Sequence, residues 1–229
     1  MRLHRHATVL ASILALSFAA GAAHARQDVD KVNGSISVAA GEVRGNLETV
    51  NGSIRIGENA QAGAAGTVNG SVHVGNDGSA RSLETVNGSI RLGERVRIEG
   101  DVETVNGSVF AGRGSRIGGN VENVNGALGL VQTEVAGSVE TVNGDVTVGV
   151  GSHVRGQLRV HKPTANWMPV RVRQRAQRIV IGPGVVIDGD LVFEREVQLY
   201  VHDTARIGTI TGATAIPFST PTAPARQPD

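Results

Sequence analysis

The heptapeptide ETVNGSI occupies Glu48–Ile54 and returns unchanged at Glu84–Ile90. Close copies follow, with ETVNGSV at Glu103–Val109 and ETVNGDV at Glu140–Val146. The central Val-Asn-Gly tripeptide occurs seven times, and the interval between copies is 18 or 19 residues throughout. A tripeptide that returns at so constant a period indicates a repeat architecture, in which each unit is one small structural element.

Each unit fits three short strands better than a pair of helices. A helical hairpin repeat needs roughly 30 residues or more and apolar residues at a helical spacing. Here apolar residues alternate with polar ones, and Ile90, Val96 and Val102 lie six residues apart. This spacing fits three strands of about six residues that close one triangular coil. We therefore predict an all-β fold, a single-stranded parallel β-helix (β-solenoid) with about 18–19 residues and three short strands per coil.

The asparagine of each Val-Asn-Gly is predicted to lie at a corner of the coil. We expect the chain to visit left-handed backbone space there, which Asn tolerates and Gly accepts freely. Because coils in register make counterparts into neighbours, these amides are expected to form a hydrogen-bonded asparagine ladder. The predicted structural column consists of Asn33, Asn51, Asn69, Asn87, Asn106, Asn125 and Asn143.

The composition agrees with a narrow aliphatic core and limits the functional classes. Glycine accounts for 31 of 229 residues and aromatic residues for 3%, so the core must be aliphatic. The formal net charge of +1 gives no reason to expect nucleic acid as a partner. The chain has no cysteine, which excludes disulfides and thiol catalysis.

Residues 1–25 have the pattern of a secretory signal peptide. Arg2 and Arg5 precede the apolar run Ala7–Ala23, and Ala23-His24-Ala25 fits the small-x-small cleavage rule. We expect cleavage after Ala25 and a periplasmic or secreted mature chain. No second apolar run of spanning length follows, so we expect no transmembrane segment in the mature chain.

The repeat pattern changes after residue 160. Residues 26–160 are predicted to form seven Val-Asn-Gly coils, and residues 161–178 a basic insertion that leaves the solenoid. Two six-residue apolar series then run through residues 179–210, from Ile181 to Ala205 and from Ile179 to Val197. They predict about two further coils of hexapeptide type. Residues 211–229 are rich in Pro, Thr and Ala and are expected to form a disordered tail.

No catalytic, cofactor-binding or metal site is predicted. His73, His153, His161 and His202 show no ligand-like spacing, and the insertion carries no Asp or Glu for acid–base chemistry. We therefore expect a non-enzymatic protein without a cofactor. The candidate interaction residues lie in the insertion, where a basic strand face could contact an anionic polymer. They are Trp167, Arg171, Arg173, Arg175 and Arg178.

Two more columns follow from the register. Glutamates are expected to stack as a like-charge column on a solvated face; they are Glu48, Glu84, Glu103, Glu122 and Glu140. The threonine of Thr-Val-Asn also recurs. It either completes a satisfied corner or, if it faces outward beside the asparagine, forms a regular polar array that could contact a glycan.

The chain resembles two groups of bacterial β-solenoids. The segments IGPGVVIDGDLVF (Ile181–Phe193) and RIGGNVENVNG (Arg116–Gly126) look like bactofilins, the polymer-forming cytoskeletal β-helix family. The ETVNGSI units resemble the adhesin-type β-solenoids of exported bacterial proteins. The resemblance spans roughly Lys31–Gly208. Bactofilins would imply filaments made by end-to-end stacking without nucleotide, although the signal peptide departs from a cytoplasmic cytoskeletal role.

The leading hypothesis is an exported, non-enzymatic β-solenoid with a structural or scaffold role in the cell envelope. It would self-polymerise end to end through unpaired strands of its first coil, near Val32 and Ile36. The competing hypothesis is a monomeric, adhesin-like module that binds a surface glycan or an anionic cell-envelope polymer through the basic insertion or through the threonine–asparagine array.

Overall fold

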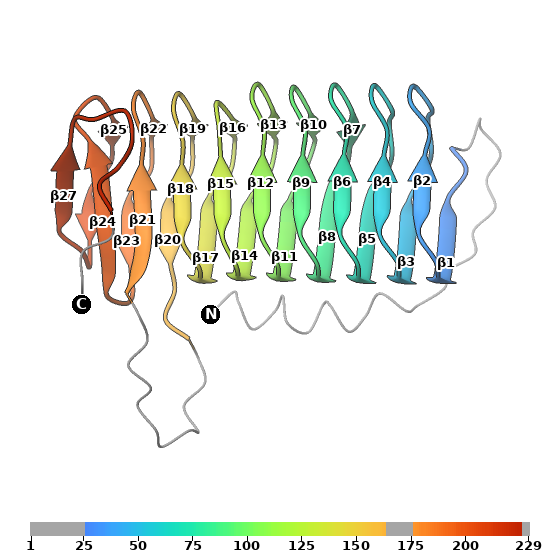
Figure 1. Cartoon of the computed structure of the whole chain (residues 1–229), viewed down its shortest axis with the longest axis horizontal. Coiled ribbons are helices and arrows are strands. Elements are labelled where there is room, and N and C mark those ends of the chain that lie inside the picture. The colour runs from blue at the N-terminus through green and yellow to red at the C-terminus, as the bar shows by residue number, and fades with distance from the viewer. Residues whose placement is uncertain (1–25, 164–175, 226–229) are drawn as a thin grey trace, which may run out of the picture.

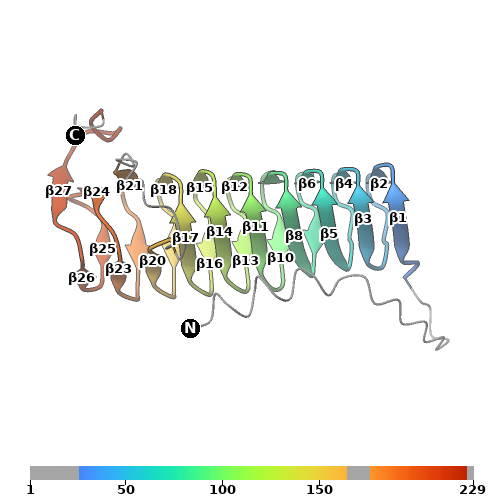
Figure 2. The same ribbon diagram turned by 90° about the horizontal axis from the view of Figure 1, so that it is seen from below.

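The computed structural model describes residues 26–163 and 176–225, and over these residues the chain forms an all-β solenoid without a helix. Three parallel sheets run side by side along a rod, and the chain visits them in turn (Figures 1 and 2). The solenoid has about nine turns of about 19 residues. The predicted fold class, the three-stranded coil and the repeat length are confirmed.

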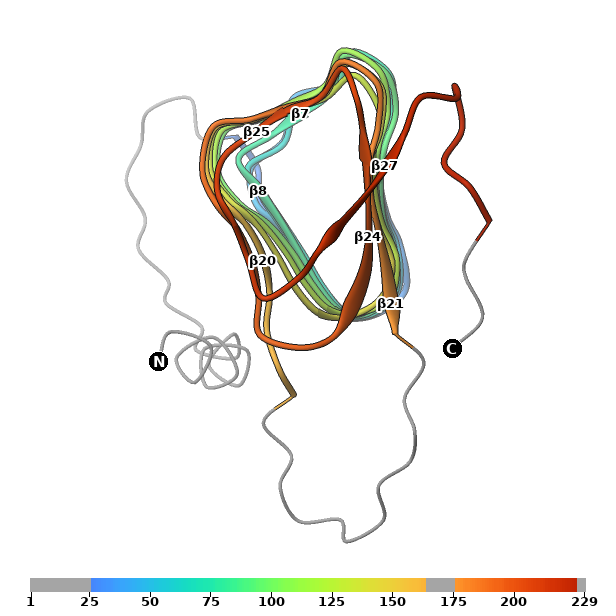
Figure 3. The ribbon, with the colours of Figure 1, turned by 90° about the vertical axis from the view of Figure 1, so that its left-hand side faces the viewer.

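The three sheets form the sides of a roughly triangular cross-section (Figure 3). Sheet A contains β1 (Val29–Asn33), β3 (Leu47–Asn51), β5 (Ala64–Asn69), β8 (Ser82–Asn87), β11 (Val102–Asn106), β14 (Val121–Asn125), β17 (Val139–Asn143), β20 (Leu158–Val160), β23 (Leu191–Phe193) and β26 (Ile210–Thr211). Sheet B contains β2 (Ile36–Val38), β4 (Ile54–Ile56), β6 (Val72–Val74), β9 (Ile90–Leu92), β12 (Val109–Ala111), β15 (Leu128–Leu130), β18 (Val146–Val148), β21 (Gln177–Ile181), β24 (Val197–His202) and β27 (Ala215–Phe218). Sheet C contains β7 (Ser79–Ala80), β10 (Arg97–Ile98), β13 (Arg116–Ile117), β16 (Glu134–Val135), β19 (His153–Val154), β22 (Val186–Ile187) and β25 (Arg206–Ile207).

The interior of the rod is one continuous aliphatic core. Alternate residues of each strand point inward, as Ile90 and Leu92 do in β9, where both are buried and Arg91 between them is exposed. The predicted inward residues Val96 and Val102 are buried as well. A single coil cannot bury its apolar side, so the stack supplies the core.

Most of the left-handed backbone positions lie at a different corner from the predicted one. At the corner between sheets B and C, one residue in each of eight successive coils has a φ between +46° and +73°. These residues are Gly41, Asn59, Asp77, Arg95, Gly114, Gln132, Gly151 and Gly184. At the predicted corner the asparagines of Val-Asn-Gly do not have a positive φ, but three of the glycines that follow them do: Gly34 (107°), Gly126 (131°) and Gly144 (142°). The prediction of a left-handed Asn was wrong, because the tight reversal occurs after sheet B.

Close stacking explains the glycine that follows each of these asparagines. A Cβ atom on Gly52, Gly70 or Gly88 would lie 2.2, 2.0 or 1.8 Å from the carbonyl oxygen of the corresponding glycine one coil earlier. Such distances are far inside van der Waals contact. The glycine is therefore required by the approach of two backbones.

Sheets A and B continue in register on both sides of the basic insertion. Leu158 in β20 pairs with Leu191 in β23, and Val146 in β18 pairs with Ile179 in β21, so both sheets continue across it. Gln177 and Arg178 already belong to β21, so the insertion ends before the boundary drawn at residue 178. Four of the five candidate interaction residues lie outside the described residues: Trp167, Arg171, Arg173 and Arg175.

The expectation of disorder from Thr211 onward was wrong for the first part of that segment. Ala215–Phe218 forms β27, which pairs with β24 in sheet B. Phe218 is buried and its ring meets the ring of His202 edge-on, with 5.0 Å between centroids. The apolar residues Ile216 and Phe218 alternate around Pro217, and this short strand pattern is hidden in a composition typical of linkers.

We predict that Gly88→Ala strongly destabilises the solenoid, whereas Gly66→Ala does not. The new methyl group at position 88 would collide with the backbone of Gly70, and overpacking of this kind costs about 1–3 kcal/mol or more. A Cβ atom added to Gly66 would have no heavy atom within 4 Å, so its alanine variant is the matched control. Urea unfolding followed by circular dichroism measures both; equal midpoints for the two variants would contradict the stacking explanation.

Candidate functional site

The seven asparagines of the predicted column stand at the corner between sheets A and B. The side-chain Nδ2 of each asparagine after Asn33 donates a hydrogen bond to Oδ1 of the asparagine one coil earlier, and the six N···O distances are 2.9–3.1 Å. All six bonds run in the same direction along the rod. The column therefore forms a continuous ladder that ties each Val-Asn-Gly coil to the next.

Other residues of the heptapeptide bond to neighbouring coils in similar ways. The backbone N–H of Ser53 donates to Oγ of Ser35, and this pattern repeats along the serine column. Thr49, by contrast, is buried, and its Oγ1 donates to the carbonyl oxygen of Gly34 at 3.1 Å. Because the threonines of this column point inward, the hypothesis of an outward threonine–asparagine array is wrong.

The two ends of the asparagine ladder differ. At its C-terminal end, Nη1 of Arg195 donates to Oδ1 of Asn143 at 2.6 Å and to the carbonyl oxygen of Val142 at 3.2 Å. Arg195 thus takes the place of the asparagine that the next coil lacks. At the N-terminal end, Asn33 accepts a hydrogen bond from Asn51. Sequence reasoning missed this cap, because Arg195 lies outside the repeat.

The outer face of sheet A carries the predicted glutamate column. The register aligns Glu48, Gly66, Glu84 and Glu103 in successive strands, and the column continues through Glu122 and Glu140. Burial, followed by the charges of Asp30 and Asp28, raises the pKa of Glu48. Burial and then the charge of Glu48 raise the pKa of Glu84. These carboxylates are therefore crowded and electrostatically unfavourable when ionised.

An ion-pair cluster closes this column at its C-terminal end. Nε2 of His161 lies 2.8 Å from Oε2 of Glu140, and Nδ1 lies 3.5 Å from Oε1 of Glu194. Arg159 also pairs with Glu194 at 3.1 Å. Within residues 26–163 and 176–225, no group of three or more His, Asp or Glu residues is arranged to hold a metal ion. The cluster instead balances charge where the glutamate column ends.

The outer face of sheet B carries a basic column that sequence reasoning did not single out. The register aligns Arg55, His73 and Arg91 in β4, β6 and β9, and Phe110 follows them in β12. Burial, and then the charges of Arg55 and Arg91, lower the pKa of His73.

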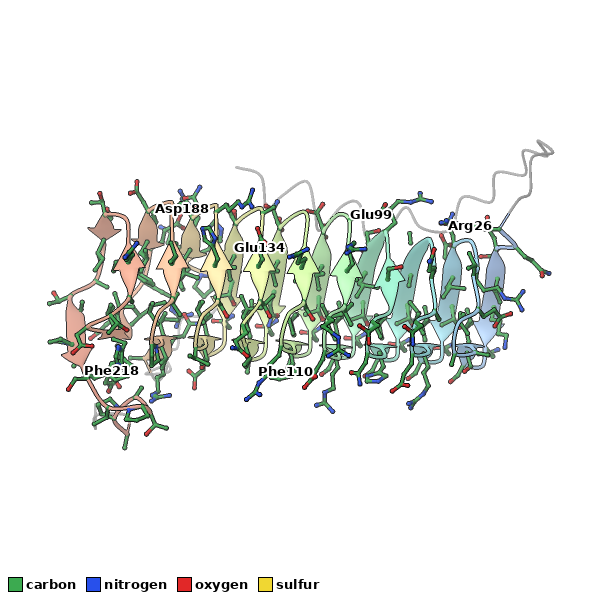
Figure 4. All side chains as sticks on the ribbon, turned by 90° about the horizontal axis from the view of Figure 1, so that it is seen from above. Arg26, Glu99, Phe110, Glu134, Asp188 and Phe218 are labelled. Carbon is green, nitrogen blue, oxygen red and sulfur yellow. The ribbon has the colours of Figure 1, made fainter. Side chains whose placement is uncertain are left out.

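The Phe110 side chain is 41% exposed and lies on the same side of the rod as Phe218, opposite Glu134 and Asp188 (Figure 4). The sequence does contain the basic column as a constant spacing: each of the three basic residues lies seven positions after the residue of its own coil in the glutamate column of sheet A.

Arg178, the one candidate interaction residue that the structure describes, is engaged within the chain. Its Nη2 donates to the carbonyl oxygen of Pro224 at 2.8 Å, and its guanidinium lies 5.2 Å from the ring centroid of Tyr200. Its backbone N–H donates to Asp145. Arg178 therefore holds the C-terminal residues against the outer face of sheet B.

Comparison with protein-family models, with curated proteins and with solved structures finds no match for this chain. In the part of the chain that the structure describes, no helix is long and apolar enough to cross a membrane. The ladders, the rod ends and the outer faces of sheets A and B are the features of this chain from which a function can be inferred.

We predict that Asn87→Ala destabilises the solenoid about twice as much as Asn33→Ala. Asn87 makes two ladder bonds, one to Asn69 and one to Asn106, whereas Asn33 makes one. Each such bond contributes about 0.5–1.5 kcal/mol. Urea midpoints of the two variants test this, and an equal loss at both positions would show that the ladder does not stabilise the fold.

We also predict that Glu84→Gln stabilises the protein at neutral pH. The pKa of Glu84 is raised in the folded state, so its stabilising contribution is present below the ordinary glutamate value of 4.5 and is lost as the pH rises through the folded value. The gain in urea midpoint should therefore be present at pH 7 and vanish at acid pH. Glu58→Gln, at an exposed position outside the column, is the control; a gain at Glu84 that does not change with pH would exclude the electrostatic cause.

Proposed function

We propose that this chain is an exported, non-enzymatic β-solenoid that serves as a rigid structural scaffold in the cell envelope. The supporting observation is the unbroken stack, in which sheets A and B each join ten strands in register. Every internal Val-Asn-Gly coil is bonded to both neighbours through the sheets and through the asparagine ladder. Such a rod keeps its length and the spacing of its surface residues, which suits a scaffold better than an enzyme with moving loops.

The proposed scaffold associates end to end through its N-terminal coil, as the resemblance to bactofilins implies. Strands β1 and β2 are edge strands that pair on one side only, and the side chain of Val32 in β1 is 66% exposed. Ile36 is buried, and Val32 is exposed at the position that corresponds to Val50 on the outer face of sheet A, so an end contact would use the backbone edges of β1 and β2. An edge strand of this kind can pair with another chain.

The C-terminal end is less suited to stacking. Pro217 in the edge strand β27 has no backbone N–H to donate to a further strand. Association is therefore proposed to begin at the N-terminal coil.

Lys31 limits this contact at the N-terminal end. In the register of sheet A it aligns with Thr49, so it takes the column position that buried threonines occupy in later coils. Its Nζ donates to the carbonyl oxygen of Ser35 at 2.8 Å. An inward-placed charge on an edge strand weakens pairing with other chains, so the end contact is expected to be reversible.

The second candidate is a monomeric, adhesin-like module that binds a glycan or an anionic polymer. The observation that favours it is the same pair of end features, Lys31 and Pro217, because both disfavour stacking. Its proposed binding residues in the insertion lie outside the described residues, except Arg178, which is bound within the chain.

We predict that Lys31→Thr strengthens end-to-end association of the chain that starts at Arg26. The variant makes the first coil resemble the later ones and removes the charge from the edge. Sedimentation velocity over a range of concentrations, with negative-stain microscopy, should show rods longer than one molecule, more of them in the variant. Thr49→Ser, inside the stack, is the control. If both wild type and Lys31→Thr remain single short rods, end stacking is refuted and the monomeric module becomes the better explanation.

A further inference from the structure

Sheets A and B carry opposite charges on the same coils of the N-terminal half. The coil with Glu48 on sheet A carries Arg55 on sheet B, and the coil with Glu84 carries Arg91. Because one chain builds both columns with one rise per coil, about 4.8 Å, the acidic and basic columns have the same spacing.

The coil between these two differs from them on both sheets. Its sheet A position is Gly66, which interrupts the acidic column, and its sheet B position is His73. The flanking arginines help to lower the pKa of this imidazole, which favours its neutral form. The acidic column thus lacks a charge on the coil where the basic column has a weak base.

These charges are not satisfied within the described chain. Among residues 26–163 and 176–225, no side-chain hydrogen bond or ion pair engages Arg55, Arg91, Glu48 or Glu84, although ion pairs form elsewhere, such as Arg95 with Asp77. The two glutamates are moreover held at raised pKa values by burial and by other carboxylates. A nearby cation would relieve that repulsion.

Apolar surface accompanies the charges on both faces. Beside the glutamates, sheet A presents the valine of each Val-Asn-Gly, and Val50, Val68, Val86 and Val105 are all partly exposed. On sheet B the basic column ends at the exposed Phe110, which lies on the same coil as Val105. Each face therefore combines a charged column with an apolar element at matching levels of the rod.

We propose that a second copy of this chain docks side by side, with its sheet A against sheet B of the first copy. The two rods lie parallel and unshifted, so that Glu48 and Glu84 of one copy meet Arg55 and Arg91 of the other. Gly66 then lies opposite His73, and on the next coil Phe110 lies opposite Glu103, with Val105 on the same strand. This proposal rests on the scaffold function but uses the sides of the rod instead of its ends.

The contact is heterologous, because it joins two different faces. Each bound copy still offers a free sheet A or sheet B, so further copies can add until a ring closes or an open row forms. Side-by-side docking widens the assembly without lengthening it, whereas end stacking does the reverse. Exposed ion pairs are individually weak and are screened by salt, so the association is expected at low ionic strength.

Charge reversal on each face tests the contact. One variant carries Glu48→Arg and Glu84→Arg, and the other carries Arg55→Glu and Arg91→Glu. Each variant alone should lose at least about tenfold in association constant at low salt, because attraction becomes repulsion. An equimolar mixture of the two should associate again, since each supplies the face that the other lacks. Circular dichroism checks that both variants fold, and Glu58→Arg with Glu94→Arg, at exposed corner positions, is the matched control.

Sedimentation velocity and negative-stain microscopy give the readout. Assemblies of single-rod length in the wild type and in the mixture, but not in either variant alone, support side-by-side docking. Association that survives either reversal, or a mixture that stays monomeric, overturns it. If the wild type stays monomeric but binds poly-L-glutamate through Arg55 and Arg91, sheet B serves an anionic polymer and the proposal is wrong. Lys31→Thr acts only on rod length, so failure of end stacking is distinguishable from failure of side-by-side docking.

Discussion

The whole structure depends on one constraint: coils of a parallel solenoid stack in register, so the nearest neighbour of most residues is their own counterpart one coil away. A residue type is then selected for how well it packs against itself. Asparagine suits this position because its amide both donates and accepts, and serine because its Oγ accepts a backbone N–H. Glycine suits it because two backbones approach closely. The repetition of ETVNGSI is the visible result of this self-matching.

The same constraint also creates costs. Carboxylates brought together on one face are crowded: burial, and then the charges of Asp30 and Asp28, raise the pKa of Glu48, and burial, and then the charge of Glu48, raise the pKa of Glu84. The column is interrupted by Gly66 and ends in the cluster around His161. The asparagine ladder likewise must end, and the guanidinium of Arg195 caps it after Asn143. The rod is therefore uniform along its middle and specialised at its ends and on its faces.

Features that depend on the repeat spacing could be predicted from the sequence, whereas features that depend on a single residue could not. Coil length, strand number and the alignment of seven asparagines all follow from spacing. Arg95 in left-handed space could not be anticipated, because Arg does not ordinarily mark such a position. The inward direction of Thr49 was ambiguous, since a threonine hydroxyl can bond to a buried carbonyl oxygen as well as to water. Arg195 lies outside the Val-Asn-Gly repeat, at a position between the apolar residues that set the register, and β27 lies beyond residue 210, where composition alone gave no register.

Because the coils are nearly identical, the rod can gain or lose a whole coil and keep its fold. Residues 70–87 form one complete unit, and its loss would join Asn69 to Gly88 and restore the same Asn-Gly corner. The ladders would close over the gap, and the molecule would shorten by one step of about 4.8 Å. Unequal recombination within the gene could thus add or remove whole coils without disturbing the fold. Selection can in this way change the length of the rod in steps of one coil.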